Sequence, residues 1–219
     1  MIKALVFDMD GVIIDSEPIH TQILVQLLKE LGKDVDPREF DEFIGMRDDE
    51  MWGVLKKRHM LKETVEQLLA LHDTYKKKRF FGNDLEPIQG IPELISKTKS
   101  MNLKIALATS SHRFLAEQIL KTLKIRHYFD VLVTGNDVSN SKPDPEVYIK
   151  AALSLGVEPS ECIAIEDSYF GIKASKGAGM KCIAYLNPNS GSQDTSSADL
   201  TVSSIKDIDL DKIIELLGR

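Results

Sequence analysis

The sequence has few of the residues and patterns that mark secreted or membrane proteins. It contains only two cysteines, Cys162 and Cys182, and one tryptophan. Both cysteines lie in apolar, strand-like runs, so we expect reduced thiols in the core rather than a disulfide or a metal pair. No apolar stretch approaches the roughly 20 residues that span a bilayer, and no secretory signal pattern opens the chain. The sequence therefore predicts a cytoplasmic protein without a membrane partner.

An excess of positive charge is also missing. The formal net charge is -6 at pH 7 and the sequence pI is about 5.4. These values argue against a general nucleic-acid binder, although they say little about a small anionic substrate. The composition is otherwise ordinary, and 219 residues suffice for a sizeable core. We expect a globular monomer that acts on a small molecule.

An acidic pair follows the first apolar run of the chain. Residues 2–6 are typical of a buried strand, and Asp8 and Asp10 come directly after them. Alternate residues of an extended chain point to the same face, so two carboxylates lie close together. This pairing suits an oxygen-ligated cation such as Mg²⁺, or a nucleophile beside a general acid/base. Aspartates are also common where strands end, so the pair alone leaves both interpretations open.

The remaining pattern predicts an α/β protein with a helical insertion. Residues 16–83 carry apolar side chains at helical spacing and contain no convincing strand; Ser16 is a candidate N-cap of the first helix. From residue 85 onward, strands and helices alternate, which predicts a doubly wound parallel sheet. The predicted strands after the first one span residues 103–108, 131–134, 162–165, 181–185 and 200–202. We therefore expect a core of residues 1–15 and 84–219, with residues 16–83 as an all-helical cap domain.

Two polar stretches are predicted to face solvent. The basic run from Lys76 to Arg79 is typical of a solvated helix end, where cations complement the helix dipole. Residues 187–197 are rich in Asn, Ser and Gly and predict an exposed loop.

Polar residues follow three of the predicted strands. Thr109 and Ser110 follow the strand at 103–108, and Glu166 and Asp167 follow the strand at 162–165. Ligands bind at the carboxyl ends of parallel strands, so both pairs can meet the first acidic pair in one crevice. Taken singly, Thr109 and Ser110 also suit helix caps, and Glu166 and Asp167 suit the acidic start of a helix.

Four short motifs, in order, resemble those of the haloacid dehalogenase superfamily, in particular its β-phosphoglucomutase and sugar-phosphatase branch. These motifs are D-x-D-G-V from Asp8, the strand ending in Thr109, K-P-x-P from Lys142, and E-D-S-x-x-G-I-x-A from Glu166. The resemblance covers essentially the whole chain and implies a Rossmann-like core. It also matches the small helical cap that this superfamily often inserts after the first strand.

The resemblance implies a role for each motif residue. Asp8 would be the nucleophile that becomes an aspartyl-phosphate, and Asp10 the general acid/base. Thr109 and Lys142 would bind and neutralise the transferring phosphoryl group; a solvated surface lysine is the alternative for Lys142. The neighbouring phosphate-binding positions would be Met9, Ser110 and Ser111. The implied cofactor is Mg²⁺, held by Asp8, the main-chain carbonyl of Asp10, Asp167, and Glu166 through water.

The cap is expected to select the substrate. His20 lies on the first cap helix, where the mutase has a histidine that couples Asp10 to cap closure, although a solvated helix residue is an equal alternative. Arg47 would grip a substrate phosphate or hydroxyl; the alternative is a surface ion pair with Asp48 or Asp49. The mutase also holds a distal phosphate with a cap lysine, and Leu71 occupies the corresponding place here.

These features predict a Mg²⁺-dependent phosphatase that hydrolyses a small phosphorylated metabolite, in particular a sugar or sugar-alcohol phosphate. A β-phosphoglucomutase-type isomerase is the alternative, because the core motifs are the same when a second hydroxyl replaces water as the attacking group. A non-catalytic phosphate-binding protein is disfavoured because every catalytic position is present. A dehalogenase is disfavoured because that branch lacks the second aspartate that Asp10 supplies.

Overall fold

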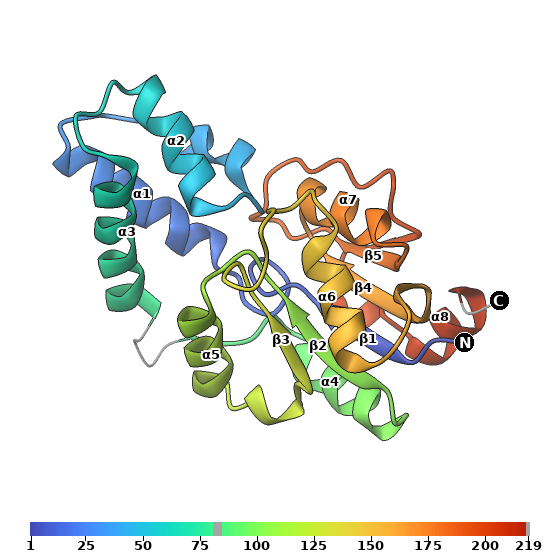
Figure 1. Cartoon of the computed structure of the whole chain (residues 1–219). Coiled ribbons are helices and arrows are strands. Elements are labelled where there is room, and N and C mark those ends of the chain that lie inside the picture. Colours follow the sequence, from blue (N-terminus) through green and yellow to red (C-terminus); the bar gives the residue numbers. More distant parts are fainter. Residues whose placement is uncertain (81–84, 218–219) are drawn as a thin grey trace.

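The computed structural model describes residues 1–80 and 85–217 of the chain (Figure 1). Its centre is a six-stranded sheet of order β3-β2-β1-β4-β5-β6, in which all neighbouring strands run parallel. The strands are β1 (Ala4–Phe7), β2 (Lys104–Ala108), β3 (Val131–Val133), β4 (Cys162–Glu166), β5 (Lys181–Tyr185) and β6 (Leu200–Val202). The predicted doubly wound α/β fold is therefore confirmed.

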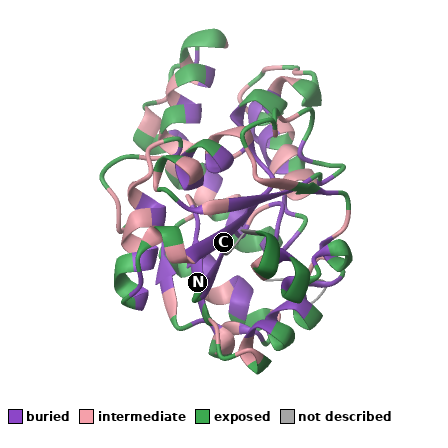
Figure 2. Ribbon diagram, turned by 90° about the vertical axis from the view of Figure 1, so that its right-hand side faces the viewer, coloured by how far each residue is buried: buried purple, intermediate pink, exposed green. Residues whose placement is uncertain are grey.

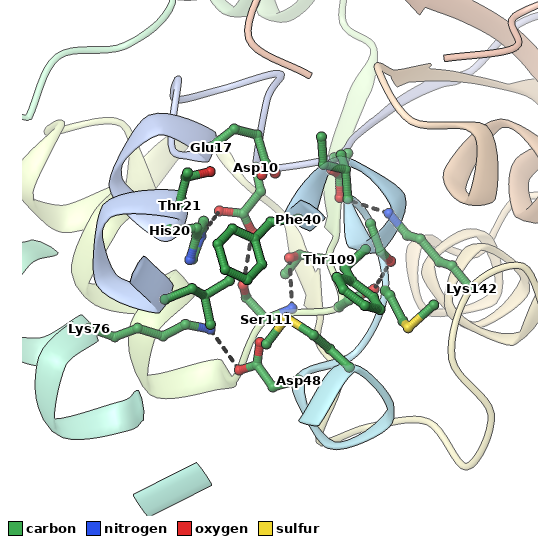
Figure 3. Close-up of a pocket in the computed structure, with 18 of the residues that line it drawn as sticks. Asp10, Glu17, His20, Thr21, Phe40, Asp48, Lys76, Thr109, Ser111 and Lys142 are labelled. Carbon is green, nitrogen blue, oxygen red and sulfur yellow. Dashed lines mark hydrogen bonds and ion pairs between the residues drawn. The ribbon is translucent and has the colours of Figure 1, made fainter. Parts of the chain in front are cut away.

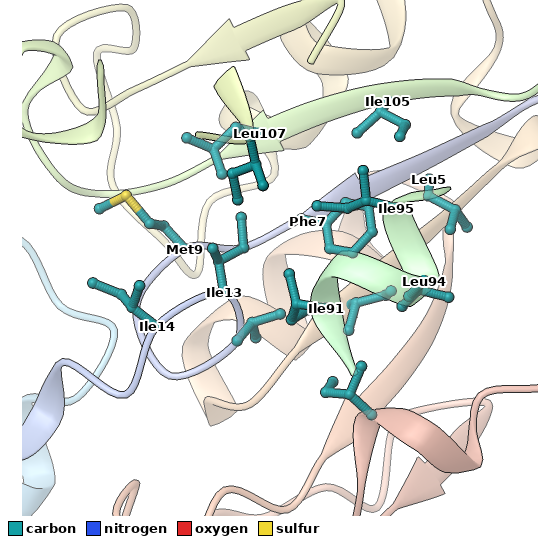
Figure 4. Packing of buried hydrophobic residues seen from close by; sticks show 14 of the residues in the cluster. Leu5, Phe7, Met9, Ile13, Ile14, Ile91, Leu94, Ile95, Ile105 and Leu107 are labelled. Carbon is teal, nitrogen blue, oxygen red and sulfur yellow. The ribbon is translucent and has the colours of Figure 1, made fainter. Parts of the chain in front are cut away.

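Helices cover both faces of this sheet. One face carries α4 (Ile91–Ser100), α5 (Arg113–Thr122) and α8 (Leu210–Leu217), and the other carries α6 (Glu146–Leu155) and α7 (Tyr169–Gly177). Strand β1 shows why both faces are apolar. Leu5 and Phe7 pack into the first layer (Figure 4), whereas Ala4 and Val6 pack beneath α6. Buried residues accordingly run along the strands, and exposed residues lie on the outer sides of the helices (Figure 2).

The cap is a separate group of helices that follows β1 in the chain and lies to one side of the sheet (Figure 1). It consists of α1 (Glu17–Glu30), the 3₁₀ segment η1 (Pro37–Phe43), α2 (Asp48–Arg58) and α3 (Val65–Phe80). These elements share a small apolar core around the buried Trp52. Residues 16–80 contain no strand, in agreement with the predicted helical insertion. The predicted boundary between residues 83 and 84 lies outside the described residues, and the domain limits stay a prediction.

Short 3₁₀ segments are the elements that the sequence pattern did not reveal. They are η2 (Arg126–Tyr128), η3 (Pro159–Glu161) and η4 (Ile205–Asp207), each three residues long. The segment η1 was expected as an ordinary helix. One turn of 3₁₀ helix is too short to establish an apolar period, which explains why the pattern misses it.

Two predictions about solvent exposure are wrong in part. Lys76 is only 5% exposed because the last turns of α3 face the sheet across a pocket; Lys77 to Arg79 are exposed as expected. In the loop after β5, Asn187 and Ser190 are buried. Their side chains bond to the backbone and carboxylates that follow β1 and β4, so this loop is anchored rather than free.

Other expectations hold. Both cysteines are free and buried within the sheet, as predicted. Within the described ranges, no helix is both long enough and apolar enough to cross a bilayer.

Candidate active site

The polar residues after β1, β2 and β4 meet at one edge of the sheet. The register places Phe7 between Leu107 and Ile165, so the three strands end at nearly the same level. A pocket at this edge is lined on one side by residues of the core and on the other by residues of the cap (Figure 3). Its core residues are Asp8, Asp10, Thr109, Ser110, Ser111, Lys142 and Asp167. The structure thus brings together the motifs that the sequence predicted to converge.

Lys142 is buried between two carboxylates. Its Nζ lies 2.7 Å from Asp8 Oδ1 and 2.6 Å from Glu166 Oε1, and it also donates to the carbonyl of Ala108 at 3.2 Å. Although burial alone would lower the pKa of an amine, the adjoining carboxylates raise the pKa of Lys142 above its ordinary value. Lys142 is therefore a fixed cation rather than the solvated surface lysine that was the alternative.

Asp10 faces the junction between core and cap. Its carboxylate accepts hydrogen bonds from Ser16 Oγ at 2.7 Å and Ser111 Oγ at 2.8 Å, and His20 Nε2 lies 3.4 Å away. Burial opposes ionisation, but His20 and the two hydroxyls outweigh it and lower the pKa of Asp10 to about 2. Ser16 is the N-cap residue of α1 as predicted, but its hydroxyl bonds to Asp10 and makes no cap bond to the helix.

Three buried carboxylates form a candidate metal site. These residues are Asp8, Glu166 and Asp167, and one carboxylate oxygen of each lies within 4.8 Å of an oxygen of the other two. Among the described residues, Asp167 Oδ1 is a buried oxygen without a hydrogen-bond partner. Burial and the charges of Glu166 and Asp8 raise the pKa of Asp167 well above its ordinary value. A hard cation with oxygen ligands, such as Mg²⁺, fits this donor set because it would satisfy the orphaned oxygen and offset the repulsion.

The members of this cluster are not equivalent. Glu166 is fully buried and already accepts from Lys142 and from Tyr148 Oη, with Ser168 on its other oxygen. Such a satisfied carboxylate suits contact through water better than direct ligation. The carboxylate of Asp10 is outside the cluster, so its predicted contribution would come from the main chain, as the motif implies.

Two glycines make room for the acidic residues. A Cβ at Gly11 would collide with the Asp167 carboxylate, and the φ of Gly11 is +78°, which other residues rarely adopt. A Cβ at Gly171 would collide with Glu166. These close approaches explain why glycine follows each acidic motif.

The residues after β2 line the core side of the pocket. Thr109 is buried in the pocket, and its Oγ1 accepts from the N–H of Ser111 at 3.0 Å. Helix α5 starts only at Arg113, so Thr109 and Ser110 do not cap it. Ser110 Oγ donates to the carbonyl of Gly45 in the cap at 3.3 Å. The side chain of Met9 is buried in the core, which leaves only its backbone for the predicted phosphate contact.

The cap residues divide into those that line the pocket and those that do not. His20 lines it, whereas Arg47 pairs with Asp49 at 3.0 Å and borders a neighbouring hollow. The surface ion pair that was the alternative for Arg47 is therefore what the structure contains. Leu71 is 41% exposed and is absent from the pocket lining.

Several pocket residues were missed from the sequence. The cap contributes Asp48, His72 and Lys76 to the pocket. Ser190, in the loop after β5, lies outside the pocket lining and donates to Asp167. His72 and Lys76 are four residues apart, so they share one face of α3, and this spacing was the available signal. Nothing in the local sequence of Ser190 indicates its contact with Asp167.

The chain matches a known protein family over most of its length. Residues 5–185 match the family model described as haloacid dehalogenase-like hydrolase. The chain belongs to this family. It is 34% identical over 182 residues to a phosphorylated carbohydrates phosphatase of Thermotoga maritima, covering 83% of each chain. It is 29% identical over 219 residues to hexitol phosphatase B of Escherichia coli K12, covering 94% of each.

A solved structure agrees in fold over the whole chain. The crystal structure of β-phosphoglucomutase from Clostridium difficile has a TM-score of 0.88 at 28% identity, covering 100% of this chain and 98% of the other. The sequence-based prediction of a haloacid dehalogenase-type hydrolase of the sugar-phosphatase and β-phosphoglucomutase branch is confirmed.

Proposed function

We propose that the protein is a Mg²⁺-dependent phosphatase that hydrolyses a small sugar or sugar-alcohol monophosphate through an aspartyl-phosphate. The observation that carries the proposal is the pairing of Asp8 with Lys142 at 2.7 Å beside the orphaned oxygen of Asp167. This pairing supports the proposal, because a carboxylate that can act as nucleophile, a fixed cation and an oxygen that can bind a metal lie around one point of the pocket. The names of the phosphatase relatives support the same activity.

In the first half of the reaction, an oxygen of Asp8 attacks phosphorus and the bond to the leaving ester oxygen breaks. Lys142 offsets the negative charge that gathers on the phosphoryl oxygens, and Thr109 binds one of them. The leaving oxygen takes its proton from Asp10. Asp10 needs that proton before the step, and the entry of an anionic phosphoryl group beside it favours protonation by raising its pKa.

In the second half, Asp10 acts as the base. It takes a proton from water, the water oxygen attacks phosphorus, and the bond from Asp8 to phosphorus breaks to give inorganic phosphate. The hydrogen bonds from Ser16 and Ser111 hold the carboxylate of Asp10 in place for both steps.

The metal would be held by Asp8, Asp167, the main-chain carbonyl of Asp10 and, through water, Glu166. When bound, Mg²⁺ would supply positive charge to the phosphoryl oxygens and to the Asp8 carboxylate. Ser190 orients Asp167 for this role through its hydrogen bond.

The alternative is a β-phosphoglucomutase-type isomerase, and one observation favours it more than the sequence did. The expected cap lysine is missing at Leu71, but Lys76 reaches the pocket instead. The absence of a lysine at position 71 is therefore no argument against a mutase. What bears on a mutase instead is whether Lys76 is free to bind a second phosphate or is paired with another residue.

A phosphate-release screen tests the proposal. Hexose, pentose, polyol and nucleotide monophosphates would be assayed with Mg²⁺, beside a coupled assay that converts β-glucose 1-phosphate to glucose 6-phosphate with the bisphosphate supplied. We expect Mg²⁺-dependent phosphate release that EDTA abolishes, and no isomerisation. Isomerisation with little free phosphate would replace the phosphatase by the mutase. A cytoplasmic monomer is proposed as its form, to be checked by light scattering and cell fractionation.

A further inference from the structure

The cap end of the pocket contains an ion pair that is complete before any substrate binds. Lys76 Nζ lies 2.6 Å from Asp48 Oδ2, on the cap side of the pocket opposite Lys142 (Figure 3). The Lys76 side chain is 7% exposed and that of Asp48 is 22% exposed, so solvent screens this pair little. The cap lysine therefore offers no unpaired charge to a second anionic group of a substrate.

A neutral donor lies beside this pair. The indole N–H of Trp52 donates to His72 Nδ1 at 3.2 Å, so the proton of the neutral imidazole is on Nε2. His72 lines the pocket, and among the described residues its buried Nε2 has no hydrogen-bond partner. A buried donor left without an acceptor is costly, which indicates that a bound molecule supplies the acceptor.

Two further polar side chains of the pocket carry hydrogen-bonding groups rather than free cations. Asp48 retains acceptor capacity on Oδ1, whose distance to His72 Nδ1 is 3.9 Å. Thr21 lines the same pocket with a hydroxyl that can donate and accept. A group that both donates and accepts hydrogen bonds matches this end better than an anion does.

We infer that Asp48, Lys76 and His72, named here the cap cluster, bind the uncharged hydroxyl-bearing end of the substrate. Asp48 is then a specificity-determining residue: it neutralises Lys76, and it disfavours substrates whose far end is a phosphate or a carboxylate. This inference rests on the proposed phosphatase activity, and it assigns to the cap cluster the selection of monophosphates with a neutral polyol or sugar tail over substrates with a second anionic group.

The inference bears on the choice between phosphatase and mutase. A mutase must hold a second phosphate at the far end of the pocket when it binds a bisphosphate. That phosphate would meet Asp48 directly beside Lys76, so the attraction of the cation is offset by the repulsion of the carboxylate. A neutral tail is not repelled by the Asp48 carboxylate.

The test compares substrates with neutral and anionic tails. Phosphate release with Mg²⁺ would be measured on sorbitol 6-phosphate, on fructose 1,6-bisphosphate, on phosphoglycolate and on p-nitrophenyl phosphate. For the natural protein we expect kcat/KM about tenfold or more higher for sorbitol 6-phosphate than for either anionic-tail compound. Equal or higher kcat/KM for the anionic tails would overturn the inference.

The decisive variant is Asp48→Asn, which frees Lys76 while keeping the size of the side chain. We expect the preference for sorbitol 6-phosphate over the bisphosphate to fall about tenfold or more, with p-nitrophenyl phosphate changed much less. Asp49→Asn is the matched control, because Asp49 is the next residue of α2 and pairs with Arg47 outside the pocket. An unchanged preference in Asp48→Asn, or the same change in both variants, would overturn the inference.

Two further measurements distinguish a failure of the inference from a misfolded variant and from a failure of the proposed function. Circular dichroism checks that Asp48→Asn is folded. If it is not, His72→Asn replaces it and should raise KM for sorbitol 6-phosphate by a larger factor than KM for p-nitrophenyl phosphate. A parallel rise for both compounds would count against the cap cluster. If the natural protein releases no phosphate even from p-nitrophenyl phosphate, the proposed function itself fails. If the natural protein hydrolyses p-nitrophenyl phosphate but prefers the substrates with anionic tails, the proposed phosphatase activity is supported and only the inference about the cap cluster is wrong.

Discussion

Replacing His72 should change how the stability of the protein depends on pH. Burial lowers the pKa of His72 from 6.5 to about 3, with Lys76 and His20 adding to the effect and Asp48 opposing it. In the unfolded chain this histidine takes up a proton below about pH 6.5, whereas in the folded protein it stays neutral. Its contribution to stability is therefore present above the unfolded pKa and is lost as the pH falls through the window from about 6.5 to about 3.

The size of the effect follows from the linkage between proton binding and folding. With pKa values of 6.5 and about 3, the His72 contribution to the free energy of unfolding falls by about 2 kcal/mol between pH 8 and pH 5. Glu17 acts in the opposite direction, because burial raises the pKa of its carboxyl to about 7 and the folded protein binds that proton first. The pH dependence of the natural protein thus mixes both residues, and the difference between natural protein and variant isolates His72.

The assay is urea unfolding at pH 8 and pH 5 for the natural protein and His72→Asn, whose amide oxygen can still accept from Trp52. Lowering the pH from 8 to 5 should reduce the free energy of unfolding of the natural protein by about 2 kcal/mol more than that of the variant. The exposed His127 on η2 supplies the control, since His127→Asn should behave like the natural protein. Parallel pH dependences in natural protein and His72→Asn would refute a buried neutral histidine, and with it the assignment of a donor at Nε2.

Three further substitutions probe the site. Ser190→Ala removes the hydroxyl that orients Asp167 and should raise the half-saturating Mg²⁺ concentration roughly tenfold, which an activity titration measures; an unchanged titration would remove Ser190 from the metal site. Gly11→Ala should abolish Mg²⁺-dependent turnover, because a Cβ collides with Asp167 and the positive φ costs about 1 kcal/mol or more. Near-normal turnover would show that the loop after β1 can rearrange. Arg47→Ala should leave the ratio of kcat/KM between sugar and aryl phosphates unchanged, since Arg47 pairs with Asp49 outside the pocket. A selective loss on sugar phosphates would restore the role suggested by the sequence.

The core of the site could be predicted because strand ends carry strong local signals. Asp8, Thr109 and Glu166 each follow a short apolar run, and parallel strands bring their carboxyl ends to one edge. The same patterning located the helical insertion, since apolar residues recur at helical spacing within residues 16–80 and no strand interrupts them. The spacing of apolar residues, about two in strands and 3.6 in helices, is a local property of the sequence, so it can be detected without knowing the fold.

The cap side of the pocket could not be predicted in the same way. Lys76 belongs to a basic run at a helix end, which normally favours solvent, and only the packing of α3 against α1 and α2 turns it inward. Its pairing with Asp48 spans 28 positions in the sequence. Ser190 reaches Asp167 across 23 positions from a loop with no regular structure. Contacts of this kind depend on tertiary packing, which local residue patterns do not encode.

The most direct test of the mechanism is to trap the covalent intermediate. Asp10→Asn lacks the base of the second step, whereas p-nitrophenyl phosphate has a leaving group that needs little help from the acid of the first. Intact-protein mass spectrometry of this variant after mixing with p-nitrophenyl phosphate and Mg²⁺ should show a gain of about 80 Da, the mass of one phosphoryl group, that maps to Asp8. The double variant Asp8→Asn/Asp10→Asn should show no gain. A phosphoryl group on another residue, or turnover by Asp8→Asn near that of the natural protein, would contradict the assignment of Asp8 as the nucleophile.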